Sequence, residues 1–358
     1  MEISFFDRTT LYYRHQLSHQ QIDGLLGKSE YQLILEEKIS QLKLLPEFLD
    51  ISDSLRQADI WFVPLKGPLL SNRIYGDATC RLFIDFDFLV RPESLDQAIN
   101  VLLQSGYQPE CFELPMTGRR YSLTLSKLHH CRLYHPEKCM SVEMHWKLFV
   151  FPVTAFERIA RLVDENILQI RFSGQNFNQF TAEFELLYVV IHGGLHGWLR
   201  LKWLTDVHEI VNRTILDKEK FDSLVKQLNA QRMVGLCNAM LHNFFPGSEL
   251  PVNYRFPRWL YRFSLHQANR DMTDTSRPIV NYELVWFLML AFPGWNYKLR
   301  VLDMHTFYAQ HLSNKRVPPF SLFFRIYYIT YTISILIRFP FRKIKGLFVK
   351  LVCKSGLQ

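Results

Sequence analysis

The chain has 358 residues, of which 48% are hydrophobic, 15% aromatic and 21% charged. This globular composition excludes wholesale disorder and the collagen-like and low-complexity classes, and the length favours two domains or one elaborated domain. The net charge of +8 comes from the C-terminal end of the chain. Nine of the 42 Lys and Arg residues lie from Lys315 to Lys354, a segment without Asp or Glu. The rest of the chain has 33 basic and 34 acidic residues. The nearly neutral body argues against an extended nucleic-acid track, which needs a basic surface, so we expect none.

The six cysteines form no C-x-x-C pair, so neither a zinc ribbon nor a thioredoxin-type site is indicated. Charged residues at Glu2, Asp7 and Arg8 interrupt the first stretch of the chain, where a signal peptide would need an apolar region. We therefore expect a cytoplasmic protein with reduced thiols.

Apolar residues at helical spacing predict a helical N-terminal segment over residues 1–58. Residues 60–65 then form an apolar run that is typical of a buried strand, and a short helix is expected over 69–75 with Gly76 at its end. Acidic and apolar residues alternate over residues 83–90, which predicts a strand. Asp85 and Asp87 would lie on one face of it, and the apolar side chains on the other face: Ile84, Phe86 and Phe88.

A helix over 94–105, closed by Gly106, is expected to follow this strand. Four strands are predicted after it, over 107–112, 121–125, 131–134 and 140–148. Beyond residue 180 the pattern is helical, with predicted helices over 184–196, 202–211, 218–228, 233–244 and 280–312. These patterns predict an α+β fold organised as 1–58, 59–178, 179–312 and a basic aromatic tail over 313–358.

The most informative pattern is the pair of acids in the strand over 83–90. Asp85 and Asp87 must point the same way, and two like charges in an apolar segment repel unless a cation lies between them. Glu143 is a third acid, on a later predicted strand, where it shares a face with His145. Three carboxylates on neighbouring strands suit Mg²⁺ or Mn²⁺ and phosphoryl transfer, whereas an isolated D-x-D pair is more often a solvent-facing strand edge.

Taken together, the motifs resemble the nucleotidyltransferase superfamily of the DNA polymerase beta type, and more narrowly its uncharacterised bacterial branch. The resemblance covers about residues 60–210 and rests on LKG at 65–67, YGD at 75–77, Arg81, DFDFLV at 85–90, VEMHW at 142–146, LY at 187–188, HGG at 192–194 with His196, and WLTD at 203–206. It implies a nucleotidyltransferase-type mixed β-sheet core between a helical N-terminal segment and a helical C-terminal domain.

The resemblance also implies roles for single residues. Asp85 and Asp87 would be the paired metal ligands, and Glu143 the third ligand or the base for the acceptor hydroxyl. Lys66 and Gly67 would approach the nucleotide phosphates at a helix start. Arg81 would neutralise a phosphate or pair with the aspartates.

The chain departs from the family pattern at two positions. Pro68 follows Gly67 where the superfamily has a small residue, which removes one backbone N–H donor. The third acid is Glu143 where the family has aspartate, and the extra methylene shifts its carboxylate. Both departures keep open a second hypothesis, a nucleotide-binding or interaction protein of a biosynthetic assembly that has little or no turnover.

Three histidines of the predicted site have alternative interpretations. His192 and His196 lie on one helix face, where they would contact substrate or, less in keeping with the sequence, a metal; the flanking Gly193, Gly194 and Gly197 favour close helix packing. His145 would contact substrate, support Glu143 or be a core residue. His129 and His130 are expected at a strand edge.

The uncharged apolar stretch over 326–337 is too short to span a bilayer, which takes about 20 residues. With the basic residues around it, the segment 315–354 would either pack on the fold or contact an anionic membrane surface or partner. The function predicted is Mg²⁺-dependent transfer of a nucleoside monophosphate from an NTP to an acceptor hydroxyl, with release of pyrophosphate.

Overall fold

The computed structural model describes residues 6–110, 122, 125–150, 153–270, 282–306 and 330. The predicted tail over 313–358, with its proposed anionic contact over 315–354, lies outside the described residues except for Thr330. Within the described parts of the chain, no helix combines the length and the apolar character needed to cross a membrane.

The N-terminal segment is helical, as predicted. A π-helical turn, Thr10–Arg14, leads to α1 (His19–Leu26) and to the long helix α2 (Tyr31–Gln57). Helix α1 starts with a capping box, in which the Ser18 hydroxyl accepts from the Gln21 backbone N–H and the Gln21 side chain accepts from the Ser18 N–H. The C-terminal half of α2 carries buried Phe48, which stacks on Phe88 of the sheet.

The next segment forms a mixed α+β core, again as predicted. Its elements, in chain order, are β1 (Phe62–Leu65), α3 (Gly67–Tyr75), β2 (Asp85–Val90), α4 (Leu95–Gln104), β3 (Gln108–Pro109), β4 (His130–His135) and β5 (Met140–His145). The five strands lie in the order β1-β2-β5-β4-β3, and only the β2–β5 pair is parallel.

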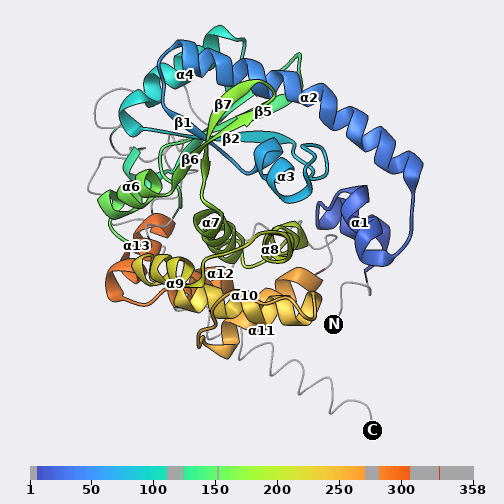
Figure 1. The fold of residues 1–358 in the computed structure, drawn as a ribbon. Coiled ribbons are helices and arrows are strands. Elements are labelled where there is room, and N and C mark those ends of the chain that lie inside the picture. The colour runs from blue at the N-terminus through green and yellow to red at the C-terminus, as the bar shows by residue number, and fades with distance from the viewer. Residues whose placement is uncertain are drawn as a thin grey trace.

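The register of the sheet places the acidic residues side by side. In the parallel pair of β2 and β5, Asp87 lies opposite Glu143 and Asp85 lies opposite Ser141. Alternate residues of the same strands, among them Phe86 and Phe88, are buried in a separate apolar cluster with residues of α2 and α4. These two helices cover one face of the sheet, and α7 and α8 lie on the other side of it (Figure 1). The acids therefore face the helical part of the chain.

The connection between the two parts was not predicted. It consists of α6 (Phe156–Glu165) and a hairpin of β6 (Ile167–Phe172) and β7 (Gln175–Phe180). The hairpin is tied to the edge of the main sheet, because the Asn178 side-chain amide donates to the Phe62 carbonyl at 2.7 Å.

Helices follow to the end of the described chain: α7 (Ala182–Leu195), α8 (Leu201–Arg213), α9 (Lys218–Gln227), α10 (Gln231–Phe244), α11 (Arg258–Asn269), α12 (Tyr282–Ala291) and α13 (Trp295–Thr306). All match predicted helices except α11. The close packing expected at Gly193 and Gly194 is confirmed: a Cβ at these positions would lie 2.5 Å from the Trp198 ring and 2.6 Å from the Met233 sulfur. The division into domains stays a prediction.

Two local predictions are wrong. Among the described residues of the predicted strand 121–125, Ser122 and Leu125 are helical, and the Leu125 carbonyl accepts from Trp146 Nε1 at 3.0 Å and from Lys147 Nζ at 2.5 Å. These long-range contacts stabilise a helical conformation, although the local alternation of polar and apolar residues favours a strand. Ile84 does not join the apolar face, because the strand begins at Asp85 and the Ile84 side chain is 59% exposed.

Candidate active site

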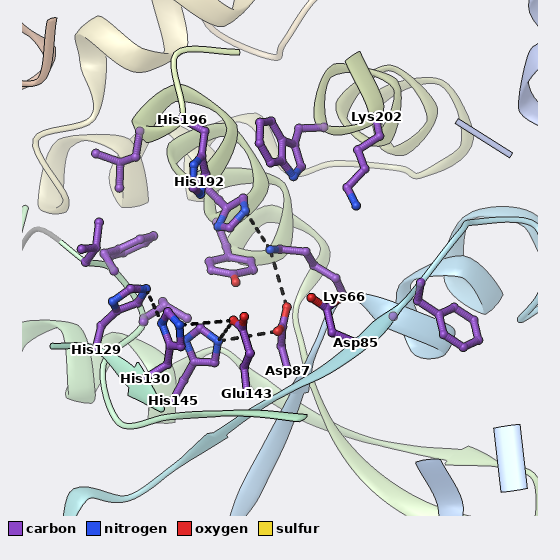
Figure 2. Close-up of a pocket in the computed structure, with 18 of the residues that line it drawn as sticks. Lys66, Asp85, Asp87, His129, His130, Glu143, His145, His192, His196 and Lys202 are labelled. Carbon is purple, nitrogen blue, oxygen red and sulfur yellow. Dashed lines mark hydrogen bonds and ion pairs between the residues drawn. The ribbon is translucent and has the colours of Figure 1, made fainter. Parts of the chain in front are cut away.

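A cavity of about 410 Å³ lies between the sheet and helices α7 and α8. Its floor carries acids and imidazoles from β2, β4 and β5, and cationic side chains enter from the start of α3 and from α8 (Figure 2). All nine predicted site residues line it: Lys66, Gly67, Arg81, Asp85, Asp87, Glu143, His145, His192 and His196. Predicted site residues up to 130 positions apart in the sequence therefore line one cavity.

The three carboxylates differ in their electrostatic surroundings. Burial raises the pKa of Asp85, and the charges on Asp87 and Glu143 raise it further. Burial also opposes the charge on Asp87, but His145 and Lys66 prevail and hold its pKa below the ordinary value. The pKa of Glu143 is lowered as well, because His145 more than offsets its burial. Asp85 is thus the acid whose negative charge is least offset by neighbouring positive groups.

The donor set suits a hard divalent cation. Asp87 and Glu143 are paired across β2 and β5, and both line the cavity. Asp85 lies two residues before Asp87 on β2 and lines the same cavity. Mg²⁺ and Mn²⁺ prefer such oxygen ligands and leave positions for water and phosphate. Burial and the neighbouring acids raise the pKa of Asp85, and a bound cation would stabilise its ionised carboxylate. The residues present therefore fit the predicted ion.

The turn between β1 and α3 holds both Lys66 and Gly67 at positive φ, which is strained for Lys66 and accessible to Gly67. Lys66 has φ 60° and ψ −130°, and Gly67 has φ 57°. Such conformations are costly for a residue with a Cβ and recur at ligand-binding turns. The Lys66 ammonium is buried; it lies 3.0 Å from His192 Nε2 and 3.9 Å from Asp87 Oδ2. Pro68 occupies the first turn of α3, where a missing N–H is tolerated.

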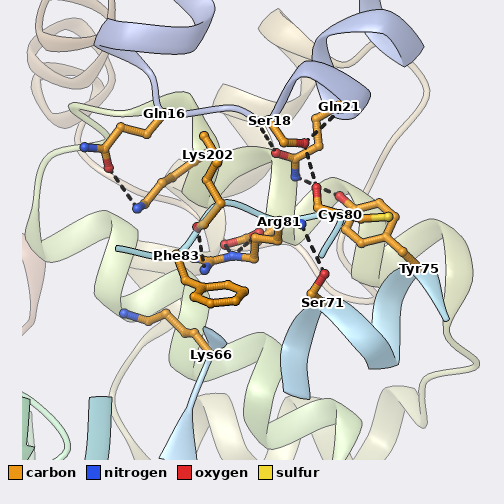
Figure 3. A network of polar contacts seen from close by, with 12 residues as sticks. Gln16, Ser18, Gln21, Lys66, Ser71, Tyr75, Cys80, Arg81, Phe83 and Lys202 are labelled. Carbon is orange, nitrogen blue, oxygen red and sulfur yellow. Dashed lines mark hydrogen bonds and ion pairs between the residues drawn. The ribbon is translucent and has the colours of Figure 1, made fainter. Parts of the chain in front are cut away.

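Arg81 does not pair with the aspartates of β2. Its Nε donates to both carboxylate oxygens of Asp206 on α8, at 2.9 and 3.1 Å, and both side chains are buried. Its backbone N–H donates to the Ser71 hydroxyl (Figure 3). The Ser71 hydroxyl in turn donates to the Asp77 backbone carbonyl. Of the two roles expected for Arg81, pairing with Asp85 or Asp87 is therefore excluded, and it joins the sheet segment to the helical part.

The predicted histidines have distinct surroundings. His145 Nε2 lies 3.4 Å from Glu143 Oε2 and 3.7 Å from Asp87 Oδ1. Burial opposes its charge, but these carboxylates raise the pKa of His145 to about 9. His192 contacts Lys66, and the His196 ring stacks on Trp203 at 4.8 Å. Neither belongs to a metal-ligating group within the described residues.

Four basic side chains that line the cavity were not among the predicted site residues: His129, His130, Arg200 and Lys202. Both Arg200 and Lys202 donate to the side-chain oxygen of Gln16, each at 2.8 Å. Burial lowers the pKa of Lys202 to about 7, and the charge of Arg81 contributes. A buried amine of this kind gains stabilisation from an anion, so this wall of the cavity suits phosphate.

Replacing Asp85 with asparagine is expected to stabilise the metal-free fold. Because the pKa of Asp85 is above its ordinary value of 3.8, the ionised carboxylate costs stability at neutral pH, and this cost vanishes below pH 3.8 where the acid is protonated in both states. Thermal unfolding in a chelator should show a melting temperature a few degrees above wild type at pH 7 and no difference near pH 3. A lower melting temperature of Asp85→Asn at pH 7 would contradict this account.

A family model described as "Uncharacterised nucleotidyltransferase" matches residues 28–246, which include α2, the sheet, the hairpin and helices α7 to α10. All residues that line the cavity fall inside this range. A search of curated proteins found no match to the chain.

Proposed function

The chain belongs to this nucleotidyltransferase family, and from that premise we propose that it transfers a nucleoside monophosphate from an NTP to an acceptor hydroxyl. Pyrophosphate would be the leaving group. The observation that supports the proposal most strongly is the placement of Asp85, Asp87 and Glu143 on one face of two paired strands, opposite cationic side chains of the same cavity. The volume of about 410 Å³ is in the range of small-molecule sites.

Each side chain has a proposed task. Asp85 and Asp87 would hold Mg²⁺ or Mn²⁺, which when bound supplies charge neutralisation for the triphosphate. Glu143 would be the third ligand: its lowered pKa makes it a weaker general base, since an effective base has a pKa near the working pH. Such a site acts by positioning and charge complementarity.

The phosphates would lie between α3 and α8. Backbone N–H groups at the start of α3 and the positive end of its dipole favour an anion there, and Gly67 allows close approach because nothing lies within 4 Å of a Cβ at that position. Lys66, Arg200 and Lys202 would contribute positive charge. His192 would orient Lys66 through their 3.0 Å contact.

The second candidate is a nucleotide-binding protein without turnover. Lys66 favours it, because the ammonium lies 3.9 Å from Asp87 and offsets part of the charge that a metal ion would otherwise neutralise. His145 acts in the same direction on Asp87 and Glu143. This candidate predicts NTP binding without product.

Labelling separates the two candidates. The purified chain is incubated with Mg²⁺, a cell extract as the acceptor pool, and ATP, CTP, GTP or UTP labelled at the α-phosphorus. Nucleotidyl transfer predicts an acceptor that carries label from one or more NTPs, and its mass identifies the acceptor. Binding of NTP without labelled product would support the second candidate. If neither occurs, the carboxylates have been assigned the wrong role.

A further inference from the structure

The imidazoles of His129, His130 and His145 lie close together in the part of the cavity that is lined by β4 and β5 (Figure 2). His130 of β4 lies directly opposite His145 of β5 in the antiparallel register, and His129 precedes His130 at the strand start. The ring centroids of His130 and His145 are 4.9 Å apart, and those of His129 and His145 are 5.5 Å apart. Residues opposite each other on one face of an antiparallel pair are held close by the backbone.

The donor atoms are near the spacing of metal ligands. One ring nitrogen from each of His129, His130 and His145 can be chosen so that all three lie within 4.8 Å of one another. His130 Nδ1 and His129 Nε2 are 2.9 Å apart. Two ligands at about 2.1 Å from a zinc ion are themselves about 3.0 to 3.4 Å apart. The widest pair in the cluster therefore needs to close by at most about 1.4 to 1.8 Å around an ion of this size.

His145 gives an independent indication of a missing partner. The residue is only 6% exposed, and within the described part of the chain neither of its ring nitrogens has a hydrogen-bond partner. Its contacts with Glu143 and Asp87, at 3.4 and 3.7 Å, are ion-pair distances beyond a good hydrogen bond. Buried polar groups are nearly always bonded, so Nδ1, which has no partner, and Nε2, which has only these two long ion-pair contacts, indicate a further ligand.

We propose that His129, His130 and His145 bind a dication of the zinc and cobalt class, beside the carboxylates. Imidazole nitrogen suits these borderline ions, whereas Mg²⁺ takes oxygen ligands and is expected at Asp85 and its neighbours. Three protein nitrogens leave a coordination position for water or a substrate oxygen. The site does not depend on nucleotidyl transfer, because ion binding is measured without nucleotide.

Titration with Co²⁺, followed by visible absorption, tests this site. The sample is the metal-free full-length chain without a histidine tag. We expect saturable binding of one Co²⁺ with the intense bands of a low-coordinate nitrogen site, displaced by Zn²⁺ but retained in excess Mg²⁺. Displacement by Mg²⁺ would place the ion at the carboxylates and overturn the proposal.

Variants locate the ion within the cavity. His129→Gln and His130→Gln should each weaken Co²⁺ binding by at least about 10-fold. His242→Gln, an exposed histidine on α10, is the matched control and should bind as wild type does. Asp85→Asn lies outside the cluster and should lose transfer but keep Co²⁺, which separates this proposal from the proposed function. Unchanged affinity in both cluster variants would overturn the site.

A direct readout covers the case in which a variant does not fold. X-ray absorption of the zinc-loaded wild-type chain reports the atoms around the ion. We expect three imidazole nitrogens in the first coordination sphere. An all-oxygen sphere would assign the ion to the acids and overturn the proposal.

Discussion

Replacing Asp87 with asparagine is expected to lower nucleotidyl transfer by about 10³-fold or more, because losing several kcal/mol of charge stabilisation costs three or more factors of ten in rate. Asp87 lies opposite Glu143 in the sheet and contacts both Lys66 and His145. The rate of label transfer from an α-labelled NTP measures the effect.

The matched control for this prediction is Asp96→Asn, which changes an exposed aspartate on α4 away from the cavity and should keep the wild-type rate. Asparagine at position 87 also leaves Lys66 and His145 with one fewer counter-charge, so thermal unfolding must accompany the assay. A folded Asp87→Asn chain with a rate within tenfold of wild type would show that Asp87 is not a metal ligand in this reaction.

Breaking the Arg81–Asp206 pair is expected to cost about 3–5 kcal/mol of stability, because one charge is left buried without its partner. The two side chains are 6% and 0% exposed, and the pair joins the segment before β2 to α8. Urea unfolding of Asp206→Asn measures the loss, and the same variant should lose activity through displacement of α8 and Lys202.

A double variant separates the effect of losing the whole ion pair from the effect of leaving one charge buried alone. Arg81→Met with Asp206→Leu removes both charges and should recover much of the stability lost by Asp206→Asn, since well-packed apolar residues often replace a buried ion pair at little cost. Lys226→Met with Asp222→Leu, which removes a surface pair, should change stability much less than Asp206→Asn does. If Asp206→Asn unfolds at the same urea concentration as wild type, the pair does not join the two parts.

The sheet and its acids could be predicted because their signals are local. Alternation over β2 places Asp85 and Asp87 on one face, and the apolar run before Lys66 marks β1. That the strands of Asp85 and Glu143 are neighbours was an expectation drawn from the shared chemistry of the three acids, since no local pattern shows which strands pair. The structure bears out that pairing through the Asp87–Glu143 register.

The histidine cluster was missed although one signal was available. The segments that became β4 and β5 are joined by the four residues 136–139, and such a short connection fixes the register of an antiparallel pair. That register, read outward from His135 and Met140, brings His130 opposite His145. The predicted bounds of 131–134 left His130 outside the strand and concealed the pair.

Other parts of the site could not be predicted from local patterns. Lys202 reaches the cavity because α8 is held against the N-terminal segment, where the Leu201 N–H donates to the His15 ring at 3.2 Å. The partner of Arg81 is 125 residues away along the chain. Contacts of this kind depend on how the helical part packs on the sheet, and neither periodicity nor spacing carries that information.

The central claim concerns which phosphorus of the NTP is transferred. Parallel reactions with α-labelled and γ-labelled NTP, Mg²⁺ and the acceptor pool test it most directly, with the Asp85→Asn, Asp87→Asn double variant alongside. We expect label on the acceptor only from the α-phosphorus, label in pyrophosphate from the γ-phosphorus, and neither product with the double variant. Acceptor labelled from the γ-phosphorus, or α-label transfer that persists in the double variant, would contradict nucleotidyl transfer at these carboxylates.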